Sequence, residues 1–362
     1  MRSGRSSFAC ILSLALVLAI PPLPQARAQA SAEESPFGLL LGVPGTQPGS
    51  FEDFERSLDE AAALGARFIR LALKWQWIEP QNDRFVWDGS TSRRVAAVEE
   101  RGMRVIPVIK IGRGWASGFD PSQPGDLSVP PTDLSETWDD SCGFSRSYYD
   151  FVYHLVDHWR GHFPVIVIEN EANANNFWAG TADEYLRVLA TAYKAVHDAD
   201  PEALIADSGT ASGAWGVCIA RDRLDDGQWS DEEAQAFLQS YYRRMPAEFL
   251  QRFATTETMR AELYSPRIDE LCADVRALLA GFDGIVDLLN LHFYEDYWHL
   301  ADVLEWIDEQ TAEAGYTVPH KMCNEYGIRD NDPTYDRLGA DQAYEVLKKL
   351  VVGLSHYPPL FI

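Results

Sequence analysis

The sequence predicts an α/β fold, a (β/α)8 TIM barrel formed by a single domain over residues 31–362. Two observations predict it. Short, almost continuously apolar runs alternate along the chain with longer amphipathic stretches, which is typical of parallel strands covered by helices on both faces. The length also fits, because barrels of this class typically have about 250 residues and range from about 200 to more than 400.

The predicted strands alternate with predicted helices, and two helices lie between the fifth and sixth strands. Strands are expected at 37–43, 67–73, 103–109, 165–169, 204–207, 285–291, 321–324 and 360–362. Helices are expected at 51–64, 91–101, 147–162, 182–199, 231–253 with 267–280, 300–314 and 340–354. Gly65, Gly102 and Gly315 follow helical stretches as C-terminal caps, and Thr181 is placed as the N-cap of another.

The predicted barrel is C-terminally short, with a minimal strand eight and with helix eight absent. The strand at 360–362 has only three residues, and no helical stretch follows it. We interpret the chain as a fragment of a longer one, with an incompletely closed barrel as the alternative. Without an eighth helix, apolar residues of the first strand such as Leu39 or Leu41 are expected to be exposed.

The first 30 residues have the features of an export signal. Arg2 and Arg5 precede an apolar run at 8–20, and small residues at 26–30 offer a cleavage site. The apolar run is shorter than the roughly 20 residues of a membrane span. The sequence therefore predicts a secreted or periplasmic protein with no membrane attachment after signal cleavage; an uncleaved anchor is the alternative.

The charge balance excludes some partners. Removal of residues 1–28 deletes three arginines and no acidic residue, which leaves 28 basic against 55 acidic residues, a net charge of −27. A chain so acidic is not expected to bind nucleic acid or an anionic membrane through its general field. The oligomeric state is not predicted.

Four cysteines lie beyond the signal segment, and their spacing fits no zinc pattern. Export permits disulfide formation. Cys142 and Cys218 are both predicted in long loops, so we favour a bridge between them among the three possible pairings. Cys323 lies in a predicted strand and is expected to be a small buried hydrophobic residue.

Two long connections, 112–146 and 209–230, follow predicted strands and contain several tryptophans. Long structured loops on this face of a barrel usually build a binding cleft. Flat indole rings suit the C–H faces of sugars, although packing is the commoner role of any one tryptophan. The candidates for sugar stacking lie just beyond predicted strands: Trp75, Trp77, Trp178 and Trp298.

Two glutamates about 150 positions apart end predicted strands. Glu171 lies in Val-Ile-Glu-Asn-Glu-Ala-Asn (167–173) and Glu325 in Lys-Met-Cys-Asn-Glu-Tyr-Gly (321–327), each directly after an asparagine. The strands of a barrel bring their C-terminal ends to one face. Two carboxylates there can cleave a glycosidic bond, because one protonates the leaving oxygen while the other attacks or stabilises the sugar cation.

Other polar side chains are predicted near this pair. Arg70 shares a strand face with Phe68, and beside Glu325 its charge would lower the pKa of that carboxyl; a purely structural bridge between strand carboxylates such as Glu169 is the alternative. His292 and Tyr294 end a strand with the same parity, although a lone histidine there is often only a core residue. No histidine or aspartate pattern indicates a metal site.

The sequence resembles retaining (β/α)8 glycoside hydrolases in several segments. They are 64–70, 77–80 and 85–88 around the second strand, then Asn170-Glu171 and Glu325. In that superfamily the acid/base glutamate follows an asparagine at the end of strand four and the nucleophile ends strand seven. The run 177–185, with Asp200-Pro201, is most similar to the β-xylosidase/α-iduronidase branch. Ala172 departs from the usual proline after the acid/base.

The resemblance implies roles for the candidate residues. It selects Glu171 over Glu169 as acid/base and Glu325 as nucleophile, and it implies that Asn170 binds the sugar 2-hydroxyl. Tyr294 would donate to the nucleophile and His292 would line the sugar subsite. The predicted function is an exported glycoside hydrolase that uses no cofactor and acts on a poly- or oligosaccharide. A non-catalytic carbohydrate-binding barrel and a retaining transglycosylase are the alternatives.

Overall fold

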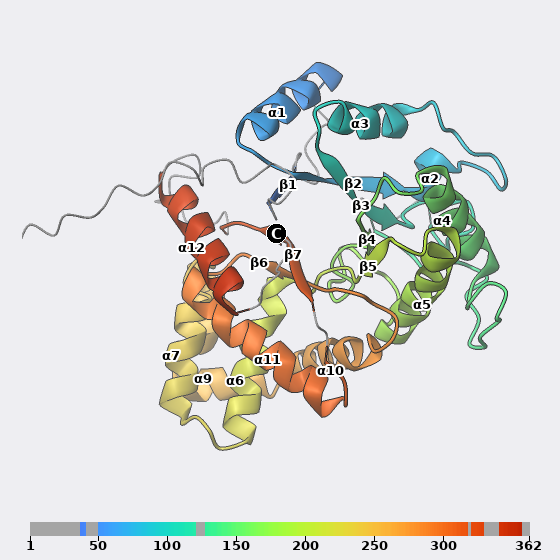
Figure 1. The fold of residues 1–362 in the computed structure, drawn as a ribbon. Coiled ribbons are helices and arrows are strands. Elements are labelled where there is room, and N and C mark those ends of the chain that lie inside the picture. The colour runs from blue at the N-terminus through green and yellow to red at the C-terminus, as the bar shows by residue number, and fades with distance from the viewer. Residues whose placement is uncertain (1–36, 41–49, 121–126, 318–319, 329–339, 357–362) are drawn as a thin grey trace, which may run out of the picture.

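The computed structural model describes residues 37–40, 50–120, 127–317, 320–328 and 340–356. The strands within these ranges all pair in parallel (Figure 1). Five of them form one sheet in sequence order: β1 Gly38–Leu40, β2 Phe68–Lys74, β3 Arg104–Lys110, β4 Val165–Ile168 and β5 Leu204–Ala206. β6 Leu289–Phe293 pairs with β7 Lys321–Tyr326. The described strands fall within one or a few residues of the predicted ones.

The two groups of strands are joined into one curved layer. Parallel bridges from Ala206 to Leu288 and from Thr210 to Leu291 connect the end of β5 to β6, and β1 contacts β7. The layer encloses a small apolar core to which β2, β3, β4, β5 and β7 contribute: Phe68, Ile106, Val108, Val165, Val167, Ala206, Leu288 and Met322. Alternate residues of the same strands pack outward in a larger core.

The helices lie outside the strands (Figure 1). Those that alternate with strands are α1 Phe51–Ala63, α3 Ser90–Glu99, α4 Arg146–His158, α5 Ala182–Ala199, α10 Pro266–Gly281, α11 Leu300–Glu313 and α12 Ala340–His356. Ser50 and Thr181 begin α1 and α5 with reciprocal capping boxes. Gly65, Gly102 and Gly315 adopt positive φ after helices, as predicted.

Between β5 and β6 the chain departs from the prediction. The connection 209–230 is not the expected loop, because it contains η3 Ser212–Ala214 and α6 Trp215–Asp225. The expected helix 231–253 is divided into α7 Asp231–Tyr241, α8 Ala247–Leu250 and η4 Gln251–Phe253, and α9 Thr256–Leu263 follows. Burial of one face of α6 stabilises a segment whose glycines favour a loop, because packing outweighs propensity in helices.

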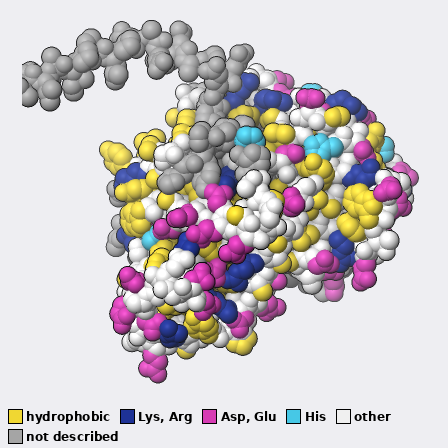
Figure 2. Space-filling view, turned by 60° about the horizontal axis from the view of Figure 1, so that its bottom comes forward, with side chains coloured by type: hydrophobic (Ala, Val, Ile, Leu, Met, Phe, Trp, Pro, Cys, Tyr) yellow, Lys and Arg dark blue, Asp and Glu magenta, His cyan; other side chains and the backbone are white. Residues whose placement is uncertain are grey.

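Some predictions lie outside the described residues. They are the export signal at 1–30, strand eight at 360–362, and the exposure of Leu41. Leu39 is more than one-third exposed, as expected. None of the helices that the structure describes combines the length and the apolar character needed to span a bilayer. In Figure 2, basic side chains are scattered among acidic ones on the visible face and form no broad patch.

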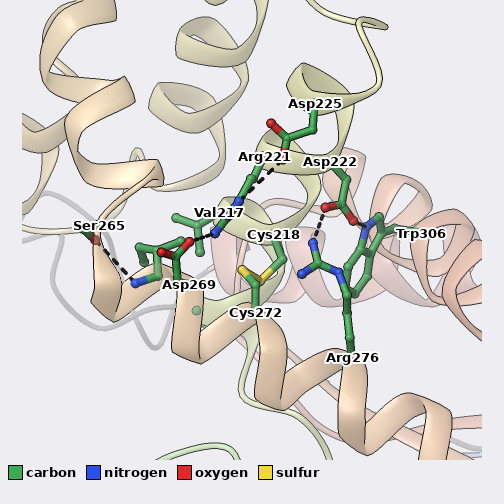
Figure 3. Close-up of a disulfide and its surroundings, with 12 residues drawn as sticks. Val217, Cys218, Arg221, Asp222, Asp225, Ser265, Asp269, Cys272, Arg276 and Trp306 are labelled. Atoms are coloured by element: carbon green, nitrogen blue, oxygen red, sulfur yellow. Dashed lines mark hydrogen bonds and ion pairs between the residues drawn. A yellow bond between two sulfur atoms is a disulfide. The ribbon is translucent and has the colours of Figure 1, made fainter.

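The disulfide differs from the one predicted. Cys218 on α6 is bonded to Cys272 on α10, with the two Cα atoms 5.5 Å apart (Figure 3). Cys142 and Cys323 are free and buried, so burial of Cys323 is confirmed and the Cys142–Cys218 pairing is wrong. The physical reason is that Cys218 lies on a helix packed against α10. Ion pairs from Arg221 to Asp269 and from Arg276 to Asp222 join the same two helices.

Loss of this bridge is expected to destabilise the protein. The cysteines are 54 positions apart, and closing a loop of that length restricts the unfolded chain by about 4 kcal/mol in the chain-entropy model. We expect Cys218→Ser/Cys272→Ser to lower the free energy of unfolding measured in urea by up to that amount. Cys142→Ala is the control, because it removes a buried thiol that forms no bridge. Equal losses in both variants would contradict the prediction.

Candidate active site

The first candidate glutamates lie where β4 ends. The strand stops at Ile168, one residue before the predicted end, and both Glu169 and Glu171 adopt positive φ, 67° and 45°. Non-glycine residues in this region cost roughly 1–3 kcal/mol each and cluster at functional sites. Strand parity does not separate the two glutamates, because it assumes extended backbone where the chain turns sharply.

Glu169 faces the wall of the barrel. Its Oε1 accepts a hydrogen bond from the backbone N–H of Ile111 at 2.6 Å, and the side chain is fully buried. Burial raises the pKa of Glu169, while the charge of Lys110 and the Ile111 N–H oppose the rise. The cation that acts on Glu169 is therefore Lys110, whereas Arg70 lies beside Glu325, so the alternative of a bridge from Arg70 to Glu169 is wrong.

Glu171 is held by the end of β5. Its backbone N–H donates to the Ser208 carbonyl at 3.0 Å, and the next N–H, of Ala172, donates to Ser208 Oγ at 3.1 Å. Tyr185 links Ser208 to β4 through two hydrogen bonds. Its hydroxyl accepts one from the Ser208 N–H and donates one to the Ile168 carbonyl. These bonds fix the strained turn and direct the Glu171 carboxylate toward His292.

Glu325 reaches the same place from β7 through an irregular strand pairing. Asn290 pairs with Met322, and His292 pairs with Glu325. The first residues of these pairs are two positions apart on β6 and the second are three apart on β7, so β7 carries one extra residue. Such a bulge re-aims side chains beside active sites. Met322 packs in the barrel interior, and the extra residue allows Glu325 also to point inward.

Arg70 lies between the two strand ends. Its Nη2 donates to Asn170 Oδ1 at 2.5 Å, and its Nη1 is 3.7 Å from Glu325 Oε1. Burial alone would raise the pKa of Glu325, but a hydrogen bond and the charge of His292, the charge of Arg70 and a hydrogen bond from Tyr294 lower it to about 2. Glu325 is therefore a carboxylate at any ordinary pH.

His292 sits between the two glutamates. Its Nδ1 lies 2.9 Å from Glu171 Oε1 and 2.7 Å from Glu325 Oε2. Burial lowers the pKa of His292, but hydrogen bonds to both carboxylates more than offset this and raise it to about 9. The side chain is completely buried, so His292 joins the carboxylates and does not line a sugar subsite as the resemblance implied.

Tyr294 and Asn170 complete the surroundings of Glu325. Burial, then the charges of Glu325 and Glu171, raise the pKa of Tyr294; its hydroxyl is thus a neutral donor to Glu325. Asn170 is buried and its Oδ1 is occupied by Arg70. Its expected contact with a sugar 2-hydroxyl would therefore use the Nδ2 side of the amide.

The nearest atoms of the two carboxylates and the imidazole lie close together. Glu171, His292 and Glu325 each offer one donor atom, and the three atoms lie within 4.8 Å of one another. Retaining glycosidases place their carboxyl groups about 5–5.5 Å apart, and inverting ones about 6.5–9.5 Å. A metal cation between these three atoms is disfavoured, because the buried charge of Arg70 lies beside Glu325 and repels it.

A second layer of polar residues holds His292. Its Nε2 lies 3.0 Å from Asn324 Oδ1, and the Asn324 N–H donates to Asn290 Oδ1 at 3.2 Å. Asn290 in turn donates its N–H to Asp207 Oδ2 at 2.6 Å. Burial raises the pKa of Asp207 to about 7, although the N–H groups of Asn290 and Gly209 oppose the rise. Sequence reasoning missed Asn290. A signal was present, because Asn290 is a polar residue inside a buried strand and lies two positions before His292, on the same face of the strand.

Two of the four predicted stacking tryptophans are buried and have structural contacts. Trp75 is buried, stacks on Phe151 of α4 with centroids 5.0 Å apart, and donates to Glu79 Oε2. Trp178 is buried against Tyr185 of α5. Both rings face the helical layer, which corrects their assignment as sugar platforms. Trp298 is 41% exposed, with the Arg243 guanidinium over its ring, and Trp77, Trp115 and Trp138 are also exposed.

The trio is expected to make stability depend on pH. The lowered pKa of Glu325 contributes stability that is present above the ordinary value of 4.5 and is lost as pH falls through about 2. The raised pKa of His292 contributes stability that is full below 6.5 and is lost as pH rises through about 9. Both contributions are full between pH 4.5 and 6.5.

The measurement compares the urea unfolding free energies of the wild type and His292→Gln across this range. Their difference should be constant from pH 4.5 to 6.5, decline above 6.5, and level off above about 9. A difference that does not change between pH 6.5 and 9 would mean that His292 carries no extra proton in the folded protein.

No family model matches the chain, and no curated protein is similar in sequence. Solved structures are similar in fold. A family 39 glycoside hydrolase from Bacteroides cellulosilyticus WH2 matches with a TM-score of 0.51 and 14% identity over 90% of this chain and 55% of its own. A glucosidase from Croceicoccus marinus matches with a TM-score of 0.49 and 12% identity, over 88% of this chain and 57% of its own. An exo-β-1,4-mannosidase from Opitutaceae bacterium strain TAV5 matches with a TM-score of 0.46 and 16% identity, over 86% of this chain and 48% of its own.

The chain therefore spans about half the length of each of these three solved structures. At such identities the likeness concerns the fold alone, and it agrees with the parallel strands and surrounding helices described above. The protein has an α/β fold of parallel strands that is structurally similar, at low sequence identity, to a (β/α)8 glycoside hydrolase.

Proposed function

We propose that the protein is a retaining glycoside hydrolase that cleaves O-glycosidic bonds of a poly- or oligosaccharide. One observation carries the proposal. Two carboxylates from the ends of β4 and β7, far apart in sequence, have oxygens within 4.8 Å of each other across a single imidazole. A protein that only binds sugar has no need for two such carboxylates, and this spacing suits double displacement.

The surroundings support distinct roles for the two residues. Glu325 is kept ionised by His292, Arg70 and Tyr294, which a nucleophile requires, so it would attack the anomeric carbon and form the glycosyl-enzyme. Glu171, on the strained turn after β4, would protonate the departing oxygen and later deprotonate the incoming water. The mechanism needs no cofactor.

Finer assignments are also proposals. The run 177–185 and Asp200-Pro201 favour a relative of the β-xylosidase/α-iduronidase branch, and the N-terminal signal features favour export to the periplasm or the exterior. Among Trp75, Trp178 and Trp298, the exposed Trp298 is the best placed to contact a sugar, because the other two are buried.

The test is a panel of nitrophenyl glycosides that differ in sugar and anomeric configuration, incubated with purified protein. We expect hydrolysis of at least one, with proton NMR of the first-formed sugar showing the configuration of the substrate. Glu325→Gln is the matched control for contaminating activity, because it removes one charge and hardly any volume. An inverted first product, or equal rates for the wild type and the control, would reject the proposal.

A further inference from the structure

The two ring nitrogens of His292 contact both candidate catalytic carboxylates and a third residue, Asn324. Nδ1 faces Glu171 Oε1 at 2.9 Å and Glu325 Oε2 at 2.7 Å, while Nε2 faces Asn324 Oδ1 at 3.0 Å. Carboxylate and amide oxygens accept hydrogen bonds and do not donate them. With both carboxyl groups ionised and the Asn324 oxygen toward the ring, each ring nitrogen donates a hydrogen bond, and this geometry fits an imidazolium in the resting site.

Only one of its two protons can move. Nε2–H donates to Asn324, whose backbone N–H is linked through Asn290 to Asp207, the residue directly after β5. Gly209 closes that edge of the ring, since a Cβ there would overlap His292 and come within 2.9 Å of Asn290 Nδ2. Nδ1–H, by contrast, lies within hydrogen-bond distance of both reacting carboxylates.

The charges that face His292 make its proton depend on the state of Glu325. Glu171 follows β4, Asp207 follows β5, and Glu325 belongs to β7. Arg70 of β2 lies beside Glu325. Glu325 makes the shortest of the contacts to His292. When Glu325 becomes a neutral glycosyl ester, the imidazolium loses the charge of a partner at 2.7 Å in a buried site, where such charges interact strongly.

We propose that His292 stores the proton that Glu171 delivers to the leaving oxygen and takes it back when the glycosyl-enzyme is hydrolysed. The inference rests on the proposed function. His292 would exchange its proton with Glu171 and would not touch the sugar. The exchange is driven by the loss of the negative charge on Glu325 when the ester forms and by its return when the ester is hydrolysed.

The cycle balances. In the first half, the Nδ1–H bond breaks as Glu171 gains the proton, and Glu171 gives a proton to the glycosidic oxygen. That oxygen keeps the electron pair of its broken bond to the anomeric carbon, to which Glu325 bonds with a lone pair. In the second half, water bonds to the carbon and Glu325 leaves with the pair. The water proton passes to Glu171 and on to Nδ1, so one water is consumed with no net proton.

The direct test is nitrogen-15 NMR of His292 at about pH 7, assigned by the loss of its signals in His292→Gln. The resting wild type should show two protonated ring nitrogens. After Glu325 is trapped as an ester with a 2-deoxy-2-fluoroglycoside of the sugar found in the panel, Nδ1 should be unprotonated. An imidazolium in both states would overturn the proposal while leaving the glycosidase intact.

Kinetics give an independent test. His292→Gln should lose about 10²–10⁴-fold in kcat/KM on an alkyl glycoside, whose leaving group needs a proton, and far less on a dinitrophenyl glycoside. Glu171→Gln/His292→Gln should be no slower than Glu171→Gln alone, because the residues act in series. Tyr294→Phe is the control, since it removes a hydrogen bond to Glu325 and should slow both substrates equally.

The outcomes separate the two hypotheses. Equal losses of His292→Gln on both substrates, with the wild type active, would reduce His292 to a support for Glu325 and overturn the proposal alone. If the wild type hydrolyses nothing in the panel and no fluoroglycoside labels Glu325, the proposed function fails, and the proton-storage proposal fails with it. Should His292→Gln not fold, the resting and trapped wild type are compared without an assignment: one histidine should change from two protonated ring nitrogens to one, and spectra without such a change would overturn the proposal.

Discussion

Glu325→Ala is expected to abolish turnover on every substrate, and azide should restore formation of a product with the opposite anomeric configuration. Removing a nucleophile of this kind typically costs about 10⁶-fold in kcat, and the space left by the side chain admits a small anion that attacks the sugar directly. Glu171→Ala should behave differently. It should still form the glycosyl-enzyme from activated aryl glycosides, and azide should then yield a product of retained configuration.

The configuration of the glycosyl azide, determined by proton NMR, distinguishes the two residues. Azide products with the two configurations exchanged would mean that the nucleophile and the acid/base had been exchanged. Glu325→Gln is the companion variant, because alanine removes the carboxylate that faces the buried charges of Arg70 and His292 and leaves a space beside them. Leaving a buried charge unpaired costs about 3–5 kcal/mol, so circular dichroism should establish that each variant is folded before its activity is compared.

The strand order and the positions of the two glutamates follow from local sequence. Continuous apolar runs such as Val165–Ile168 are recognisable because a parallel strand is buried on both faces. Polar residues directly after them then fall on one face of the barrel. These are properties of short segments, and the sequence carries them directly.

The relation between Glu171 and Glu325 is beyond sequence reasoning because both depend on irregular backbone. Parity along a strand assumes extended residues, yet Glu169 and Glu171 have positive φ and β7 contains a bulge before Glu325. Each irregularity is stabilised by distant residues, Ser208 for Glu171 and the pairing with β6 for Glu325. A local pattern cannot show which distant groups will stabilise a strained turn.

The same limit explains the errors on tryptophan and cysteine. Trp75 lies directly beyond β2, where a sugar platform is expected from sequence, but α4 offers it Phe151 and Tyr148, and the ring turns outward. The sequence predicts Cys218 in a loop, but in the structure it lies on α6. Packing against α10 and α11 stabilises this helix, and the local sequence does not show that packing. Which partner a side chain meets is decided by tertiary packing, and sequence spacing carries little information about it.

Gly209→Ala is expected to disable the site although residue 209 bears no reactive group. Gly209 follows β5 with φ of +72°, and an added Cβ would overlap the His292 ring and come within 2.9 Å of Asn290 Nδ2. His292 is fully buried between two carboxylates and Asn324, so the ring has no free space into which it could retreat. We expect kcat to fall by at least about 100-fold, as when general acid–base catalysis is lost, and unfolding to become easier by about 1–3 kcal/mol from overpacking alone.

Gly227→Ala separates the steric effect from the effect of backbone conformation. Gly227 has nearly the same φ, +67°, but a methyl group added at that residue would meet no atom within 4 Å. An L-residue in this region costs roughly 1–2 kcal/mol, so Gly227→Ala should lower the urea midpoint slightly and leave kcat unchanged. Full activity in Gly209→Ala would show that His292 can move without consequence, and both its bridging position and its proposed storage of the proton would then have to be abandoned.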